Sequence, residues 1–118
     1  MHPEFDNRVP PVAPEAEIEE MMARLQRRQQ EIAQIQRGVD AMLVKGFSRA
    51  SEVTATVRGT GRLVEISIDP VTVRRHDAHD IGAIVTEAVN DALDRLAAAT
   101  QARFAPVLAD GQDSFTAR

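Results

Sequence analysis

One stretch, residues 52–70 (EVTATVRGTGRLVEISIDP), constrains the fold more than any other part of the chain. Apolar and polar residues alternate on both sides of a glycine-containing turn, and many of them are β-branched, which predicts two β-strands. The turn Gly59-Thr60-Gly61 fits a hairpin, because glycine adopts the positive φ angles that tight turns need. We expect Pro70 to end the second strand, because proline has no N–H group for a sheet.

The alternation also predicts how the two strands pair. A two-residue loop puts Val57 opposite Val64 and brings the apolar residues to one face: Val53, Ala55, Val57, Val64, Ile66 and Ile68. A three-residue loop would instead pair Val57 with Leu63 and place the two apolar sets on opposite faces. We therefore expect the two-residue loop. Because an isolated hairpin is marginal in water, other elements must cover its apolar face.

A long helix is predicted before the hairpin, over residues 15–43. Its apolar residues recur at alternating steps of three and four, interrupted at Arg28: Ile18, Met21, Leu25, Ile32, Ile35, Val39 and Met42. This spacing is typical of a helix that packs along its length on another helix. Residues 45–48, in the connection to the hairpin, are a candidate for a short third strand.

A second long helix is predicted from Asp77 to about Arg103. Its apolar face follows the same spacing: Ile81, Ile84, Val85, Ala88, Val89, Ala92, Leu93, Leu96 and Ala99. Asp77 is a plausible N-cap, and Pro106 is expected to stop the helix.

These elements predict an α+β fold: a long helix, a two- or three-stranded antiparallel sheet, and a second long helix. Each helix is about 38 Å long at about 1.5 Å per residue, whereas the hairpin spans only about 25 Å. The surplus apolar length indicates a second copy of the chain, and a homodimer is the commonest closed assembly. Residues 1–14 are expected to form a disordered Pro-rich arm, 15–105 the domain, and 106–118 a flexible tail.

Composition excludes several classes of protein. The chain has no cysteine, which excludes disulfide bonds and thiol chemistry and fits a cytoplasmic location. No run approaches the roughly 20 apolar residues of a membrane span, so no membrane role is expected. Residues 1–23 carry a net charge of −5, residues 24–75 of +5, and residues 76–118 of −4. A basic middle segment can bind a polyanion locally despite the overall charge of −4.

The residues together resemble the YbaB/EbfC family of nucleoid-associated proteins. The resemblance covers about residues 18–104 and consists of four features in order. They are the opening helix MMARLQRRQQEIAQIQ, the glycine turn within TATVRGTGRLVEISIDP, a gap of about ten residues, and the helix TEAVNDALDRLAAAT. The resemblance implies a tweezers-like homodimer that binds double-stranded DNA with little sequence preference. It also implies a location at the nucleoid and a role in organising it or modulating transcription.

Candidate DNA contacts are the basic residues of the middle segment: Arg24, Arg27, Arg28, Arg37, Lys45, Arg49, Arg58 and Arg62. Neutralising phosphates supplies most of the affinity for DNA, and the planar fork of arginine suits this contact. The alternative for the first-helix arginines is a solvated helix face with local pairs such as Arg27–Glu31. For Arg58 and Arg62 it is a charged hairpin end that blunts strand pairing.

Candidate residues for the core and the dimer contact are apolar residues of the hairpin and the second helix: Val53, Val57, Val64, Ile66, Ile68, Ile81, Val85 and Leu96.

No catalytic function is expected, and no cofactor or metal. The glycine turn lacks a third glycine, so it does not match a dinucleotide-binding loop, and no serine lies in a nucleophile motif. His76 and Asp80 are four residues apart but have no distant third ligand.

The alternative function is a protein–protein adaptor or scaffold dimer, for instance one associated with secretion. An uncovered Ile/Met stripe on the first helix would favour this alternative and a protein partner on the long helices, because exposed apolar patches mark interaction sites.

Overall fold

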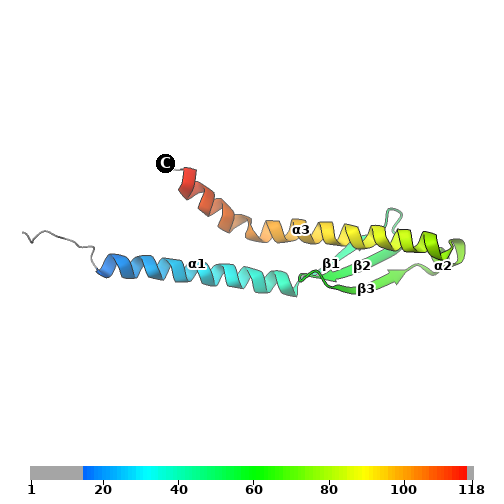
Figure 1. Ribbon diagram of the computed structural model, residues 1–118, viewed down its shortest axis with the longest axis horizontal. Helices are drawn as coiled ribbons and strands as arrows, with labels where there is room; N and C mark the ends of the chain where they lie inside the picture. Colours follow the sequence, from blue (N-terminus) through cyan, green and yellow to red (C-terminus); the bar gives the residue numbers. More distant parts are fainter. Residues whose placement is uncertain (1–14, 117–118) are drawn as a thin grey trace, which may run out of the picture. The chain divides into compact units, whose positions relative to one another are not determined.

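The computed structural model describes residues 15–116. It contains, in order, α1 (Glu15–Ala41), β1 (Leu43–Phe47), β2 (Val53–Arg58), β3 (Leu63–Ile68), α2 (Pro70–Arg75) and α3 (Ala78–Thr116) (Figure 1). The chain divides into two compact units, one ending at Gln34 and the other beginning at Ile35. The described part of the first unit is the N-terminal part of α1, and the second unit, here called the body, holds all the other elements. The arm expected over residues 1–14 lies outside the described residues.

The three strands form one antiparallel sheet in the order β1-β2-β3. The predicted α+β architecture is therefore confirmed. The candidate third strand, expected over residues 45–48, exists as β1 but begins two residues earlier and ends one residue earlier. Two hairpin pairs also agree with the expected register, because Val53 lies opposite Ile68 and Ala55 opposite Ile66. In the first strand pair, Gly46 lies opposite Ala55 and Lys45 opposite Thr56.

The hairpin loop differs from the expectation. The N–H group of Arg58 donates to the carbonyl oxygen of Arg62 at 2.7 Å, which closes a three-residue loop with Gly61 at a φ of 90°. Val57 consequently lies opposite Leu63, so the predicted Val57–Val64 pair is wrong. A β-bulge next to Val57 adds one residue to β3, so the remaining pairs keep the expected register. A three-residue loop with one bulge thus places the apolar residues of both strands on one face, as the expected two-residue loop would have done.

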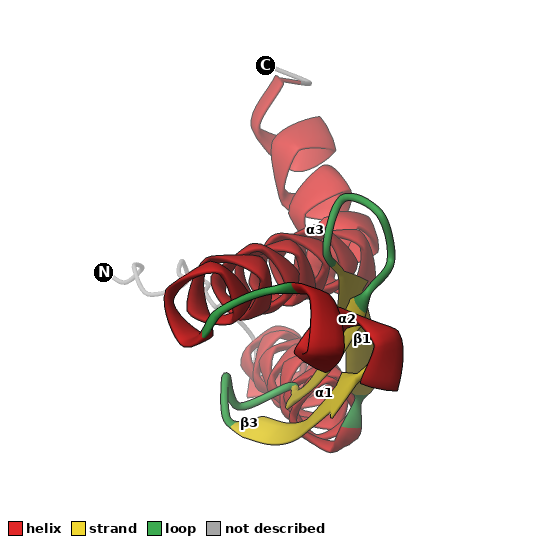
Figure 2. Ribbon diagram, turned by 90° about the vertical axis from the view of Figure 1, so that its right-hand side faces the viewer, coloured by secondary structure: helices red, strands yellow, loops and turns green. Residues whose placement is uncertain are grey.

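The core lies between α3 and the first two strands. Alternate residues of β2 (Val53, Ala55 and Val57) are buried against residues of α3 spaced four apart (Ala88, Ala92 and Leu96). The helix approaches β1 closely because Gly46 has no side chain, and a Cβ atom there would collide with the backbone of Ala88 and Ala92. β3 extends past the helix: α3 packs on β1 and β2, and Figure 2 shows β3 as the strand farthest from α3.

The hairpin turn rests on the last turn of α1. The N–H group of Gly59 donates to the carbonyl oxygen of Met42 at 2.9 Å. A Cβ atom on Gly59 would collide with the carbonyl oxygen of Val39, so only glycine fits here. This contact fixes the C-terminal end of α1 to the sheet and buries Val39.

The helix boundaries agree only partly with the sequence patterns. α1 ends at Ala41, two residues early, and α2 was not predicted. The carboxylate of Asp69 accepts a hydrogen bond from the N–H group of Val71 at 3.0 Å, so Asp69-Pro70 starts α2 as well as ending β3. Asp77 caps α3 as predicted, accepting from the N–H group of Asp80 at 2.9 Å.

Pro106 does not stop α3, which was a wrong prediction. The helix contains Pro106 and continues to Thr116, and Figure 1 shows a change of direction in its C-terminal, orange part. Proline removes one helical hydrogen bond and crowds the preceding turn, which kinks a helix without necessarily ending it. The domain limits at residues 15 and 105 remain predictions.

Candidate nucleic-acid interface

Two of the candidate basic residues share the face of the sheet turned away from α3. Lys45 lies opposite Thr56, and Arg58 follows Thr56 by two residues on the same face. Side chains in this diagonal relation across two strands are within reach of each other. Both are exposed, and so is Arg62, which closes the hairpin loop with Arg58. These three residues (Lys45, Arg58 and Arg62) are called the hairpin cluster below.

The hairpin cluster is available to an external anion. Within residues 15–109, none of its side chains has an ion-pair or hydrogen-bond partner. The nearest acid on the same face is Glu65, which lies opposite Thr56 and is separated from Lys45 by one whole strand. Glu65 is diagonal to Arg58 across β2 and β3, just as Lys45 is across β1 and β2. Three basic groups outnumber this one acid, so the local potential stays positive, which favours binding of phosphate.

Three more candidates lie in the first unit, on α1. Arg24 and Arg28 are one helical turn apart, with Arg27 beside them, and all three are exposed. The Arg27–Glu31 pair that we considered as an alternative is absent from the described structure. Arg28 continues the apolar stripe of the helix, so it lies closer to that stripe than Arg27 does.

The last two candidates, Arg37 and Arg49, belong neither to the hairpin cluster nor to the arginines of the first unit. Arg37 is two residues before the buried Val39, so it lies on the opposite side of α1 from the hairpin turn. Arg49 lies in the turn between β1 and β2, at the far end of β1 from the hairpin turn. The backbone N–H group of Arg49 donates to a carboxylate oxygen of Glu87 at 3.1 Å. The charge of this acid reduces the positive potential around Arg49.

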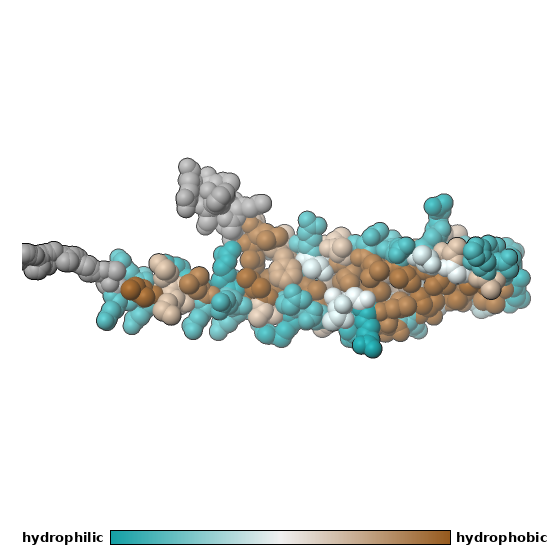
Figure 3. Space-filling view, viewed as in Figure 1, coloured by the Kyte–Doolittle hydropathy of each residue, from teal (hydrophilic) through white to brown (hydrophobic). Residues whose placement is uncertain are grey.

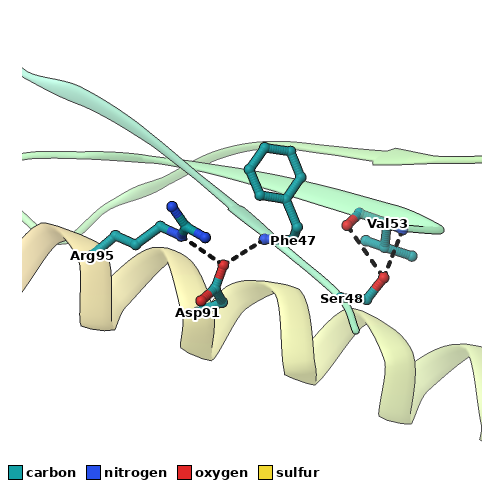
Figure 4. A network of polar contacts seen from close by, with 5 residues as sticks. All are labelled: Phe47, Ser48, Val53, Asp91 and Arg95. Carbon is teal, nitrogen blue, oxygen red and sulfur yellow. Dashed lines mark hydrogen bonds and ion pairs between the residues drawn. The ribbon is translucent and has the colours of Figure 1, made fainter. Parts of the chain in front are cut away.

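A polar network ties α3 to the outer edge of β1. A carboxylate oxygen of Asp91 accepts from the N–H group of Phe47 and from the guanidinium of Arg95, both at 2.8 Å (Figure 4). The same guanidinium lies 5.5 Å from the centre of the Phe47 ring. The hydrogen bond from Phe47 and the contact with Arg95 hold the pKa of Asp91 below its usual value. Two acids of α3 thus bind backbone N–H groups at this edge: Asp91 binds that of Phe47 at the end of β1, and Glu87 binds that of Arg49 in the turn after it.

Ser48 organises the turn at the far end of β1. Its hydroxyl donates to Glu52 at 2.6 Å and accepts from the N–H group of Val53 at 2.9 Å. The bond from Ser48 is the main reason why the pKa of Glu52 is lowered. This network holds the turn that carries Arg49, but it brings no further basic group to that turn.

The apolar candidates occupy different environments. Val53, Val57 and Leu96 are buried, whereas Ile66, Ile68, Ile81 and Val85 are half-buried. Val64 is 48 % exposed on β3. The α1 stripe is covered only near its C-terminal end: Ile18, Met21 and Leu25 are at least half exposed, whereas Val39 is 2 % exposed. Figure 3 shows a further hydrophobic band along the body, between α3 and the strands.

Sequence reasoning missed the acids that cap β1. Glu87 and Asp91 read as ordinary solvated residues of an amphipathic helix, and their partners lie 38 and 44 residues away. Their spacing of four on a helix, about 6 Å, matches a spacing of two on a strand, about 6.6 Å. That match becomes visible only when the helix is placed on the sheet.

Neither a metal site nor a membrane-spanning helix is found among the described residues. No group of three or more histidine, cysteine or acidic residues among them is arranged to hold a metal ion. Among the described helices, none combines the length and the hydropathy needed to cross a membrane.

Comparisons with known proteins identify the family and support the fold. Nucleoid-associated proteins of Nocardia farcinica and Streptococcus pyogenes are 28 % and 33 % identical to this chain. The alignments span 80 % and 71 % of this chain and 86 % and 85 % of theirs. A crystal structure of an uncharacterized protein from Helicobacter pylori has the same fold, with a TM-score of 0.60 and 18 % identity over 75 % of this chain and 92 % of that one. The sequence profile of the YbaB/EbfC DNA-binding family, which is not an enzyme family, matches residues 15–111, and the chain therefore belongs to this family.

Proposed function

We propose that this protein is a non-enzymatic, homodimeric nucleoid-associated protein that binds double-stranded DNA through phosphate contacts. Membership of a DNA-binding family is the observation that carries the proposal. The hairpin cluster supports it, because three exposed basic side chains without an acidic partner suit a phosphate backbone. The arginines of α1 provide a second basic group. A location at the nucleoid and a role in organising it or modulating transcription follow from this activity.

Little sequence preference is expected of this binding. Sequence is read by hydrogen bonds to base edges, usually from a helix or strand lying in a groove. The hairpin cluster presents long charged side chains around a turn, without an aromatic or amide group among them. Contacts of this kind position a protein on DNA but do not distinguish one sequence from another.

A homodimer is proposed because one chain leaves too much apolar surface uncovered. The exposed stripe of α1 and the hydrophobic band of the body are both present in the folded chain. The exposed stripe is also what an adaptor protein would use. The adaptor remains the second candidate for this reason, but the family and the basic clusters favour DNA.

Fluorescence anisotropy with a labelled duplex of about 30 base pairs, repeated across a salt series and with a scrambled sequence, tests the proposal. We expect binding that weakens steeply with salt and is unchanged by scrambling. Replacing Lys45, Arg58 and Arg62 by alanine should reduce the slope of log K against log salt by about 0.9 for each phosphate that the variant no longer neutralises. The triple Arg24/Arg27/Arg28→Ala variant tests the α1 group in the same way.

Arg49→Ala is the matched control, because it also removes an exposed arginine but lies beside Glu87. It should change the slope by less than either triple variant. Absence of binding at low salt would overturn the DNA proposal and direct attention to a protein partner on α1.

A further inference from the structure

Lys45 differs chemically from every other candidate DNA contact. Of the 14 lysine and arginine residues in the sequence, it is the only lysine. A lysine amine can lose its proton and attack an acyl carbon, whereas a guanidinium stays protonated and is not a nucleophile at neutral pH. Acylation also removes the positive charge of a lysine. Lys45 is therefore the one charge of the hairpin cluster that acylation can remove.

The strand holds Lys45 in a fixed place on the face of the sheet turned away from α3. Gly46, the next residue, packs on the backbone of Ala88 and Ala92, so Lys45 points to the opposite face. Thr56 lies directly across from Lys45 and is only 7 % exposed. Since α3 packs on the other face, neighbouring side chains cover Thr56. Lys45 is one of these neighbours, and a stem lying over Thr56 brings its amine toward β2.

A basic side chain and two apolar ones surround this amine. Arg58 is diagonal to Lys45 across β1 and β2, and within residues 15–109 it has no hydrogen-bond or ion-pair partner. Leu43 and Phe47 flank Lys45 on the same face of β1 and are 59 % and 39 % exposed. Figure 4 shows the Phe47 ring on the side of β1 away from α3. A guanidinium suits a phosphate group, and exposed apolar side chains suit a short acyl chain. The surroundings therefore match both ends of an acyl phosphate.

We propose that Lys45 is a site of acetylation by acyl phosphates, with Arg58 holding the phosphate of the donor. The neutral amine attacks the acetyl carbon, so a nitrogen–carbon bond forms and the carbon–oxygen bond to the phosphate breaks. Inorganic phosphate leaves with the bonding electron pair, and the amine proton passes to the solvent. The product is an uncharged amide between Leu43 and Phe47.

Acetylation of Lys45 weakens the hairpin cluster as a phosphate contact. The cluster has three positive charges beside one acid, Glu65, and the modification removes one of the three. The slope of log K against log salt for duplex DNA should then fall by about 0.9, the value for one phosphate contact. This consequence rests on the proposed function, whereas the modification itself does not.

Incubation of the purified protein with acetyl phosphate tests the modification. Peptide mass spectrometry gives the rate at Lys45, and Nα-acetyl-lysine in the same solution gives the rate of an amine without neighbours. We expect Lys45 to react about tenfold faster, because a basic cluster concentrates anions around it. An uncharged donor, N-hydroxysuccinimidyl acetate, should show much less of this preference. Equal rates for Lys45 and the free amine with acetyl phosphate would overturn the proposal.

Arg58→Ala tests whether the neighbouring guanidinium holds the donor. It should slow acetylation of Lys45 by acetyl phosphate severalfold and acetylation by the uncharged donor clearly less. Arg49→Ala is the matched control, because Arg49 lies at the far end of β1, and it should leave both rates unchanged. Circular dichroism checks that both variants are folded. Equal slowing with the two donors would mean that Arg58 acts only on the amine, which would overturn the phosphate-holding role.

DNA binding of the acetylated protein separates this inference from the proposed function. A smaller salt slope after acetylation supports both. An unchanged slope would overturn the effect of acetylation on DNA binding and leave the proposed function intact. If the unmodified protein bound no DNA, the proposed function would be overturned, and the acetylation rates would still decide whether Lys45 is a modification site.

Discussion

The two edge strands of this sheet, β1 and β3, differ in how far the rest of the chain covers their outward backbone groups and apolar side chains. At the β1 edge, two acids of α3 accept hydrogen bonds from the backbone N–H groups of Phe47, at the end of the strand, and of Arg49, in the turn after it, and the helix lies over the strand. At β3, the outward backbone groups pair with no strand of the described chain, Val64 is exposed, and Ile66 and Ile68 are only partly buried against the core. An open edge pairs readily with any available strand. The difference between the edges leaves β3 as the more open edge of the sheet.

The largest effect is expected at Gly46, where α3 approaches β1. Gly46→Ala would push a methyl group into the backbone of Ala88 and Ala92, which cannot move aside as a side chain can. We expect the free energy of unfolding to fall by about 3 kcal/mol or more, measured by denaturation at fixed protein concentration. Gly82→Ala is the control: its Cβ atom meets open space on α3, and it should stabilise the helix by about 0.5–1 kcal/mol. A loss below about 1 kcal/mol for Gly46→Ala would contradict the close approach.

A valine pair compares the covered strand with the uncovered one. Val57→Ala removes two buried methyl groups beneath α3 and should cost about 2 kcal/mol. Val64→Ala, on the half-exposed side chain of β3, should cost less than about 1 kcal/mol at low protein concentration. Under the proposed homodimer, the cost of Val64→Ala should grow with protein concentration, because a second chain would then cover part of the exposed surface of β3. Equal costs at all concentrations would remove the distinction between the strands.

Weakening the cap on β1 should have a smaller effect. Asp91→Asn keeps the size of the side chain but removes the charge that pairs with Arg95 and strengthens the bond from Phe47. We expect the midpoint of thermal unfolding to fall by a few degrees. Asp94→Asn makes the same change on the exposed side of α3, where the described structure shows no partner for it, and should be neutral. If both variants behaved alike, Asp91 would be an ordinary surface acid.

Acidification should reversibly weaken the contacts of two carboxylates, Asp91 at the β1 edge and Glu52 in the turn between β1 and β2. The folded structure lowers the pKa of Asp91 and of Glu52. A carboxyl group with a depressed folded pKa contributes stability above its unfolded pKa, about 4, and loses it as the pH falls through the folded value. Thermal unfolding measured from about pH 6 to pH 3 should therefore show a loss that begins near pH 5. The loss should be shallower in Asp91→Asn. An unchanged pH profile in that variant would exclude Asp91 as a contributor.

The sequence was sufficient for the elements whose signal is local. Alternation identified β2 and β3, and helical spacing identified α1 and the first part of α3. α2 was missed, although Asp69-Pro70 is a sequence signal for a helix start, because the same proline was interpreted only as a strand end. The bulge beside Val57 had no separate signal, since an odd loop with a bulge produces the same facial pattern as an even loop. Pro106 predicted a helix end, but a proline inside a long helix can kink it without ending it.

The candidate site was less predictable, because it depends on which distant residues meet. Charge alone grouped eight basic residues, but the sheet register brings only Lys45 and Arg58 together on one face, near Arg62. Arg49 differs from the hairpin cluster because its backbone N–H group donates to the acid Glu87, a residue 38 positions away. The apolar spacing of α1 predicted its helix but carried no information on what covers Ile18 or Leu25, since helical periodicity specifies a face and not its partner.

Amide hydrogen exchange across a protein dilution series tests the contrast between the edges most directly. The N–H group of Phe47 is bonded to Asp91 within one chain, so its protection should not depend on concentration. The N–H group of Ile66 points away from β2, because the N–H group of Asp69 donates to the carbonyl oxygen of Glu52 and bonded pairs alternate along the ladder. It should therefore exchange rapidly in the dilute monomer and, under the proposed homodimer, become protected as the protein concentration rises. Protection of Ile66 in the monomer, or rapid exchange of Ile66 in the dimer, would contradict the account.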